Sequence, residues 1–413
     1  GAVIALAKVA HPTDEDSFMR IKVLLKDPHM QVRESACIAI GLLGNKEGIP
    51  LLKDIISNNS RGKDLVGRQN DVLNRTRSFA AMALGFIGLR VSGTDITDFL
   101  VDVIKSKNMV DLKVAAAQGL YLVDERRGVP DLIDLYNDRE LSPHVRAHVG
   151  IALGKLKARS SAQTLLKGIS NKNDHIARSS AIALGLVANP EDKQAVNMLR
   201  KRATAGGSRA TRNFSMISLG ELGSDLGLKT LLERLRRGQP MDKAYAALAL
   251  GIQGFNGNLK EKAEVTKLVY GEYKNTKAPS LKGALAISIG LLDGKQYAED
   301  IRKDIDNIST QRTQGHLAIA LALLNDQNSI PTIRELVRKR GDIGRRTTAA
   351  IALGMLRDRE AISLLEDVMD KSSNSKAILG SATVAMGHIG DRSAVPILSN
   401  ILKNRKDHQD MTR

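Results

Sequence analysis

The chain has 413 residues, of which 42% are hydrophobic, and a formal net charge of +17. Aromatic residues make up only 3% and Trp is absent, so an aliphatic core of Ala, Leu, Ile and Val is expected. The single cysteine excludes a disulfide framework within the chain, and no apolar run approaches the roughly 20 residues of a membrane span. The positive charge favours an acidic partner, such as nucleic acid, an anionic surface or an acidic protein, without choosing among them.

A motif of alanine, leucine and glycine recurs along the chain, first in VRESACIAIGLLG over residues 32–44. Most spacings between successive motifs are about 31–39 residues, with one longer gap, and such a period is typical of a helical repeat array. We take the motif's last small residue as the anchor of each repeat. The anchors are Gly41, Gly85, Gly119, Gly154, Gly185, Gly220, Gly251, Gly290, Ala322, Gly354 and Gly387, and Ala7 fits one step earlier.

Each period contains two amphipathic segments. The first, such as IPLLKDII over 49–56, has apolar residues at helical spacing and is called the A helix. The second contains the anchor, has small residues on one face, and is called the B helix. A glycine inside a helix costs about 1 kcal/mol relative to alanine, so its recurrence predicts close packing between helices. Because Ala322 takes the anchor position once, small size is expected to matter more than unusual backbone angles.

The helix pair resembles the HEAT-repeat family, especially the bacterial type first noted in phycobilin lyases, over essentially the whole chain. The resemblance implies an all-α, right-handed α-solenoid, an armadillo-type fold, of about eleven helix pairs. It also implies A helices on the convex side, B helices on the concave side, and a ladder of acidic and basic residues between neighbouring repeats. The spacing that carries the resemblance occurs in Asp27 with Arg33, Asp71 with Arg77, and Glu140 with Arg146.

The basic residue of this spacing persists in later repeats, where the acidic residue is often missing. We therefore expect several basic residues to lack the partner that is usual in the family. The later basic residues are Arg212, Lys243, Lys282 and Arg346.

No shift in composition marks a second domain, so residues 1–413 are predicted to form one continuous solenoid. Residues 57–76 lengthen one period and are predicted to be an inserted loop. Residues 1–9 are interpreted as the end of an earlier B helix, and a B helix is expected to begin near residues 410–413. The chain is therefore expected to be truncated within a repeat at both ends, as a fragment of a longer repeat protein. The compartment stays open, with the cytoplasm as the default and export not excluded.

The sequence offers few residues for catalysis or cofactor binding. His144 and His148 have the i, i+4 spacing of a metal site, but no His-Glu pair accompanies them, and we interpret them as helix-surface residues. Cys37 lies within a B helix and is interpreted as a small buried hydrophobic residue. The motifs GxSxG and P-loop are absent. We therefore predict no catalytic, cofactor or metal site and a non-enzymatic protein.

Basic residues concentrate where A helices turn into B helices, whereas the opposite edge is predicted to be close to neutral. The helix dipole favours cations at the C-terminal ends of A helices and disfavours them at the N-terminal ends of B helices. Basic residues at the starts of B helices therefore indicate anion binding. The leading hypothesis is a scaffold that binds protein through its concave face and basic edge. The alternatives are nucleic-acid or other polyanion binding along this edge and a bilin-lyase-like accessory enzyme. The candidate binding residues are Arg200, Lys201, Arg202, Arg209, Arg212, Arg234, Arg236, Arg237, Arg338, Lys339, Arg340, Arg345 and Arg346.

Overall fold

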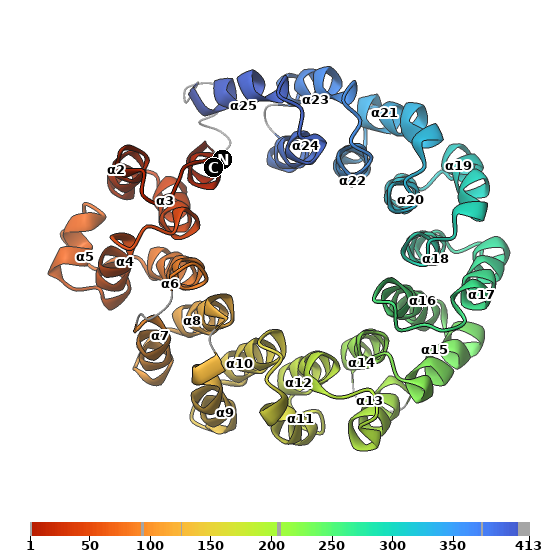
Figure 1. Ribbon diagram of the computed structural model, residues 1–413, viewed down its shortest axis with the longest axis horizontal. Coiled ribbons are helices and arrows are strands. Elements are labelled where there is room, and N and C mark those ends of the chain that lie inside the picture. Colours follow the sequence, from red (N-terminus) through yellow and green to blue (C-terminus); the bar gives the residue numbers. More distant parts are fainter. Residues whose placement is uncertain (1, 92–94, 125, 205–207, 373–374, 404–413) are drawn as a thin grey trace. The chain divides into compact units, whose positions relative to one another are not determined.

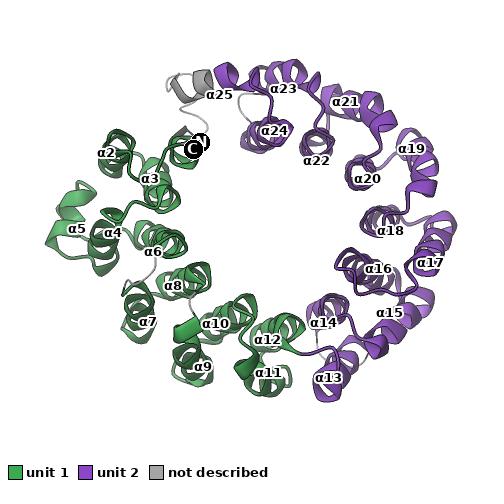
Figure 2. Ribbon diagram, viewed as in Figure 1, with its two compact units in different colours: residues 1–188, 412–413 green, residues 189–411 purple. Residues whose placement is uncertain are grey.

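The computed structural model describes residues 2–91, 95–124, 126–204, 208–372 and 375–403, and every regular element in these ranges is helical (Figure 1). The chain separates into two compact units, unit 1 up to residue 188 and unit 2 from residue 189 (Figure 2). No helix in the described ranges is long and apolar enough to span a membrane. The B helix expected near residues 410–413 lies outside the described residues.

Unit 1 begins with α1 and continues with five helix pairs, A helix first. The pairs are joined by short turns, of which two contain 3-10 helices, η2 (Arg126–Gly128) and η3 (Arg159–Ser161). The helices are α1 (Ala2–Val9); α2 (Glu15–Val23), extended by η1 (Leu24–Lys26), and α3 (Met30–Leu43); α4 (Gly48–Ser57) and α6 (Asn74–Gly88); α7 (Ile96–Lys105) and α8 (Val110–Val123); α9 (Val129–Asn137) and α10 (Pro143–Lys155); α11 (Ala162–Gly168) and α12 (Asp174–Val187).

Unit 2 contains six helix pairs followed by α25 (Ala394–Lys403), so the described chain has the eleven pairs predicted. The 3-10 helices η4 (Lys295–Tyr297) and η5 (Gln327–Ser329) precede two of its A helices. The pairs are α13 (Lys193–Thr204) and α14 (Arg209–Leu222); α15 (Asp225–Arg237) and α16 (Pro240–Phe255); α17 (Lys262–Asn275) and α18 (Pro279–Leu291); α19 (Ala298–Asn307) and α20 (Gln311–Leu323); α21 (Ile330–Arg338) and α22 (Ile343–Met355); α23 (Ala361–Asp370) and α24 (Lys376–Ile389).

Within each unit the helices form two layers, and each B helix packs on the B helix of the next pair (Figure 1). In unit 2 the inner layer consists of α14, α16, α18, α20, α22 and α24, and the A helices form the outer layer. Four of the B helices begin at a polar side chain that accepts a hydrogen bond from the first turn, which satisfies an otherwise unpaired N–H. Such N-caps are Ser142, Asn173, Ser208 and Asp342.

The anchor glycines bring neighbouring B helices into backbone contact, as predicted. A Cβ atom on Gly41 would lie 2.5 Å from the carbonyl oxygen of Ala83 in the next B helix. On Gly220 it would lie 2.2 Å from the carbonyl oxygen of Ala249. Nearly every larger residue at these positions would therefore push the two helices apart.

The anchor of the third pair was predicted at the wrong residue. At Gly41, Gly154, Gly220 and Gly354 the anchor glycine faces the alanine two residues before the next anchor, as Gly154 faces Ala183. Gly85, however, faces Gly119, with 2.6 Å from its hypothetical Cβ to the Cα of Gly119. Gly119 therefore takes the alanine position, and Tyr121 occupies the anchor position. The anchor was misassigned because Gly119 lies two residues before the true anchor position.

The insertion over 57–76, predicted to be a loop, contains the short helix α5 (Ser60–Leu65). Asn59 caps α5 by accepting a hydrogen bond from the Gly62 N–H at 2.8 Å. A Cβ on Gly62 would lie 2.1 Å from the carbonyl oxygen of Asp54, so α5 packs directly on α4. The insertion is therefore a packed part of unit 1.

Candidate binding surface

Several basic residues at the starts of B helices donate hydrogen bonds to the C-terminal end of the A helix in the same pair. The Nε–H groups of Arg77, Arg146 and Arg346 donate to the carbonyl oxygens of Ile56, Tyr136 and Val337 at 2.8, 2.7 and 3.0 Å. Each carbonyl belongs to the residue before the last of its A helix. The last carbonyls of a helix have no partner within it, so a guanidinium there satisfies an acceptor that would otherwise need water.

The same basic residues also connect neighbouring repeats. Arg77 donates to Asn108 at 2.9 Å, Lys243 to Glu272 at 2.6 Å, and Lys282 contacts Asp304 at 2.8 Å. Each partner lies within or directly after the A helix of the next pair. The expectation that later basic residues would lack the partner usual in the family is therefore wrong for Lys243 and Lys282, because the following repeat contributes a carboxylate to each.

Four of the thirteen candidate binding residues form hydrogen bonds that stabilise the fold. Arg345 is only 5% exposed, and its Nη2 donates to the carbonyl oxygens of Lys339 and Arg340 at 2.7 and 3.1 Å. Arg346 donates to the carbonyl oxygen of Val337, as described above. Arg200 donates to Thr230 at 2.8 Å, and Arg234 to the carbonyl oxygen of Thr204 at 2.6 Å.

The remaining nine candidates lie at or near the turns between A and B helices of unit 2. Arg202 and Arg212 are half-buried. The other seven are exposed, and they define what we call the basic edge of unit 2: Lys201, Arg209, Arg236, Arg237, Arg338, Lys339 and Arg340.

One cavity opens on the basic edge, with a volume of about 610 Å³. It lies between α21, the start of α22 and the end of α23. Four cationic side chains and one carboxylate line it, together with Val368 and Ser372. The charged residues are Arg338, Arg340, Arg346, Lys371 and Asp367.

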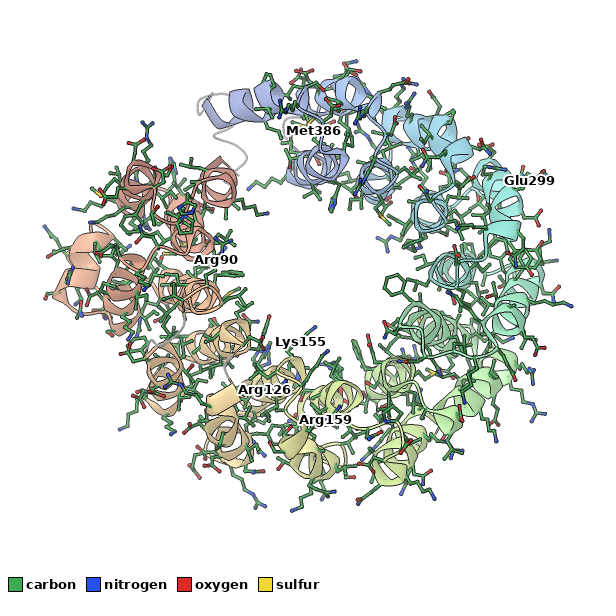
Figure 3. All side chains as sticks on the ribbon, viewed as in Figure 1. Arg90, Arg126, Lys155, Arg159, Glu299 and Met386 are labelled. Atoms are coloured by element: carbon green, nitrogen blue, oxygen red, sulfur yellow. The ribbon has the colours of Figure 1, made fainter. Side chains whose placement is uncertain are left out.

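A second basic cavity, of about 560 Å³, lies in unit 1 at turns from B to A helices and was not predicted from the sequence. Arg126, Lys157 and Arg159 line it, no carboxylate of the described residues does, and Figure 3 labels the two arginines beside α9 and η3. The sequence predicted a near-neutral edge because acidic residues lie close to these cations along the chain. The fold brings the cations of two successive turns together instead.

The inner layer of unit 2 exposes a row of aliphatic side chains that the sequence analysis did not identify. Along α16, Tyr245, Leu248, Ile252 and Phe255 are partly or largely exposed, whereas the residues beside Leu248 on either side are buried. Since α16 packs on α14, α15 and α18, this stripe faces the inner side of the unit.

The same exposure recurs three residues before every anchor of unit 2. We call these six side chains the inner row, and all of them are aliphatic and at least partly exposed. Unit 1 has Ile or Met at this position in four of its five helix pairs and Gln118 in the fifth. The inner row is Ile217, Leu248, Ile287, Ile319, Ile351 and Val384.

The outer layer of unit 2 has the opposite character. Glu299 extends outward from α19 (Figure 3) and forms an i, i+4 ion pair with Lys303 at 2.7 Å. The exposed positions of α15, α19 and α21 are mainly charged, with Leu226 as an exception. Apolar exposure on one layer and charge on the other distinguish a binding face from an ordinary solvated surface.

His144, His148 and Cys37, which were considered as possible functional residues, all lie in unit 1. His144 and His148 stack edge to face at 4.9 Å between ring centroids, and His175 from α12 lies 5.8 Å from His144. Within the described residues, no group of three potential ligands has the geometry to hold a metal ion. Cys37 is fully buried, which raises the pKa of its thiol to about 12, so its thiol is unreactive, as predicted.

Comparison with known proteins supports the architecture. Residues 97–185 and 306–379 match the family model of HEAT repeats. The chain therefore contains HEAT repeats. No curated protein is detectably similar to it in sequence.

Solved structures similar to this HEAT-repeat protein share little sequence with it. The phycocyanin lyase complex of CpcE and CpcF from Nostoc is 17% identical, covering 62% of this chain and 94% of that one, with a TM-score of 0.41. Human deoxyhypusine hydroxylase is 14% identical, with coverages of 84% and 98% and a TM-score of 0.30. Kap121p bound to Nup53p is 13% identical, with coverages of 97% and 53% and a TM-score of 0.43. At these scores the similarities say nothing about a shared partner or activity.

Proposed function

We propose that this HEAT-repeat protein is a non-enzymatic scaffold that binds a protein segment along the inner row of unit 2. The observation that carries the proposal is the row itself, with one partly exposed aliphatic side chain from each of six successive B helices. A contiguous exposed apolar surface of this kind is typical of interaction sites, because its burial against a partner is favourable.

The dimensions of the row suit an extended partner. Packed helices lie about 8–10 Å apart, so six successive B helices span roughly 40–50 Å. An extended segment rises about 3.3 Å per residue and would need roughly 12–15 residues to cover this length. Repeat proteins bind long partners along such inner surfaces.

The basic edge of unit 2 adds a preference for acidic partners. Its seven exposed cations lie at or near the turns that lead into B helices carrying the inner row. The six side chains of the inner row are aliphatic, which favours protein over nucleic acid, because single-stranded nucleic acid is bound largely through stacking on aromatic side chains. Beside the row, the stripe of α16 adds the aromatic side chains of Tyr245 and Phe255. A protein segment with apolar residues flanked by acidic ones fits both features.

The test compares two double variants of the chain as bait in extracts of cells that produce it. Leu248→Gln with Ile287→Gln removes two side chains of the inner row. Leu226→Gln with Leu268→Gln is the matched control, because these leucines are exposed on the outer layer of the same unit, at 37% and 36%. Circular dichroism and urea midpoints establish that both variants are folded.

Quantitative mass spectrometry then measures the proteins recovered with each bait. We expect at least one protein whose recovery falls about tenfold with the inner-row variant and stays unchanged with the control, equivalent to about 1.4 kcal/mol of binding energy. If every recovered protein is insensitive to the inner row, the proposal is wrong. If nucleic acid is recovered instead, and its binding weakens steeply with salt, the polyanion alternative replaces it.

A further inference from the structure

The cavity on the basic edge has the charge of an anion site. Arg338 and Lys371 each pair with one carboxylate, of Glu335 at 2.5 Å and of Asp367 at 2.7 Å, and all four of these side chains are at least half exposed. Exposed pairs of this kind are weak and exchange readily with other partners. Arg340 is exposed and has no side-chain partner among the described residues.

Arg346 is the least exposed of the four cations that line the cavity. Its Nε–H donates to the carbonyl oxygen of Val337, and its Nη1 lies 3.3 Å from the hydroxyl of Ser372. The pKa of Arg346 is lowered, first by burial and then by the positive charges of Arg345 and Arg340. The crowded guanidinium groups therefore create a positive potential that nearby acidic groups do not cancel.

The turn that carries Arg340 is fixed before any ligand binds. Buried Arg345 donates to the carbonyl oxygens of Lys339 and Arg340, as described above. Asp342 caps α22 by accepting from the Arg345 N–H at 2.7 Å, and its own N–H donates to the Gln311 side chain at 2.7 Å. Preorganised donors lose less entropy on binding than mobile ones. Arg345 is therefore a positioning residue for this cavity.

We propose that this cavity receives a phosphorylated side chain of the protein segment that binds unit 2, an inference that rests on the proposed function. A phosphoryl group carries about −1.5 to −2 charges at pH 7 and three acceptor oxygens, which suit a cluster of arginines better than a single carboxylate does. The volume of about 610 Å³ is in the range of small-molecule sites, so it admits the side chain as well as its phosphate.

The local charges favour one phosphoryl group over a polyanion that runs along the edge. Asp367 lines the cavity and Glu335 pairs with Arg338, so a continuous row of phosphates would pass close to two carboxylates and be repelled. A single phosphoryl group can sit among Arg338, Arg340 and Arg346 and leave both carboxylates with their present partners or in solvent. Nucleic acid is therefore the alternative outcome of the test.

Isothermal titration calorimetry of the chain with O-phosphoserine and with inorganic phosphate tests the cavity without any protein partner. We expect saturable binding of one phosphoryl group per chain, and L-glutamate is expected to bind at least about tenfold more weakly. In Arg338→Ala with Arg340→Ala, the affinity for O-phosphoserine is expected to fall at least tenfold. The matched control is Arg236→Ala with Arg237→Ala, which removes two exposed cations elsewhere on the basic edge.

Three results would overturn the inference. The first is the absence of saturable binding by either phosphate probe. The second is an equal loss of affinity in the control variant, which would indicate an unspecific basic surface. The third is tight binding of a mixed-sequence oligonucleotide that depends equally on both pairs of arginines. The inner-row variants keep every residue of the cavity, so a failure of this inference and a failure of the proposed function are distinguishable.

Discussion

Replacing Gly220 of α14 by alanine is predicted to destabilise unit 2, although alanine is the better helix former. The added Cβ would lie 2.2 Å from the carbonyl oxygen of Ala249 and 2.9 Å from its Cα. These are backbone atoms, so no side chain can rotate out of the way. The two B helices would have to separate by about 1 Å to restore ordinary contact distances.

The expected magnitude follows from two opposing contributions. Overpacking of a tight core contact costs about 1–3 kcal/mol. The higher helix propensity of alanine recovers up to about 1 kcal/mol. With overpacking at about 2 kcal/mol, the middle of that range, the net loss is about 1 kcal/mol, which corresponds to about 2–4 °C in melting temperature for a unit of this size.

Gly271→Ala in α17 is the control, because a Cβ there would have no atom within 4 Å. This change is expected to stabilise by about 0.5–1 kcal/mol through helix propensity alone. Thermal and urea unfolding followed by circular dichroism measure both variants. If Gly220→Ala proves neutral or stabilising while Gly271→Ala behaves as expected, the anchor glycines are not a packing device.

Three further predictions concern stability, each measured by the urea midpoint. Tyr273→Phe is expected to cost about 1.5–3 kcal/mol, because the buried hydroxyl donates to the Asp304 carboxylate at 2.6 Å; an unchanged midpoint would refute this contact. Arg334→Gln leaves the Asp358 carboxylate, whose side chain is 4% exposed, without its partner at 2.7 Å, and we expect a loss of about 3 kcal/mol; a loss below about 1 kcal/mol would contradict this. Burial, and then two neighbouring histidines, lower the pKa of His148, so the unfolded chain binds this proton more readily and stability should fall as the pH drops below about 6.5. His148→Gln should flatten that decline, and an equal slope in the variant would exclude His148 as its source.

The fold could be predicted from the sequence because apolar and small residues recur along the chain with a regular period. Apolar spacing in segments such as 49–56 predicts A helices, and the recurring small residues predict the close contacts of Gly41 and Gly220. The repeat pattern gives the wrong anchor at Gly119, because only the contact of Gly119 with Gly85 reveals that Tyr121 occupies the anchor position. In that register the basic position of the repeat falls on Lys113, a signal that could have corrected the assignment.

The binding surface could be predicted only in part, because charge is visible in sequence whereas exposure is not. Arg340 and Arg345 read alike as basic residues near a turn, yet one is exposed and the other is buried against backbone carbonyls. The inner row was not identified from the sequence, because Ile and Leu are usually core residues. A signal existed in the large aliphatic residue set between small neighbours, as with Leu248 between Ala247 and Ala249.

Site-specific photo-crosslinking at the inner row tests the central claim most directly. A photoreactive phenylalanine derivative replaces Ile319 in one variant and Leu268 on the outer layer in the other, in cells that produce the protein. Illumination is predicted to give discrete covalent adducts with a protein at position 319 and none at position 268. Adducts at neither position, or the same adducts at both, would contradict the claim that the inner row of unit 2 is a protein-binding face.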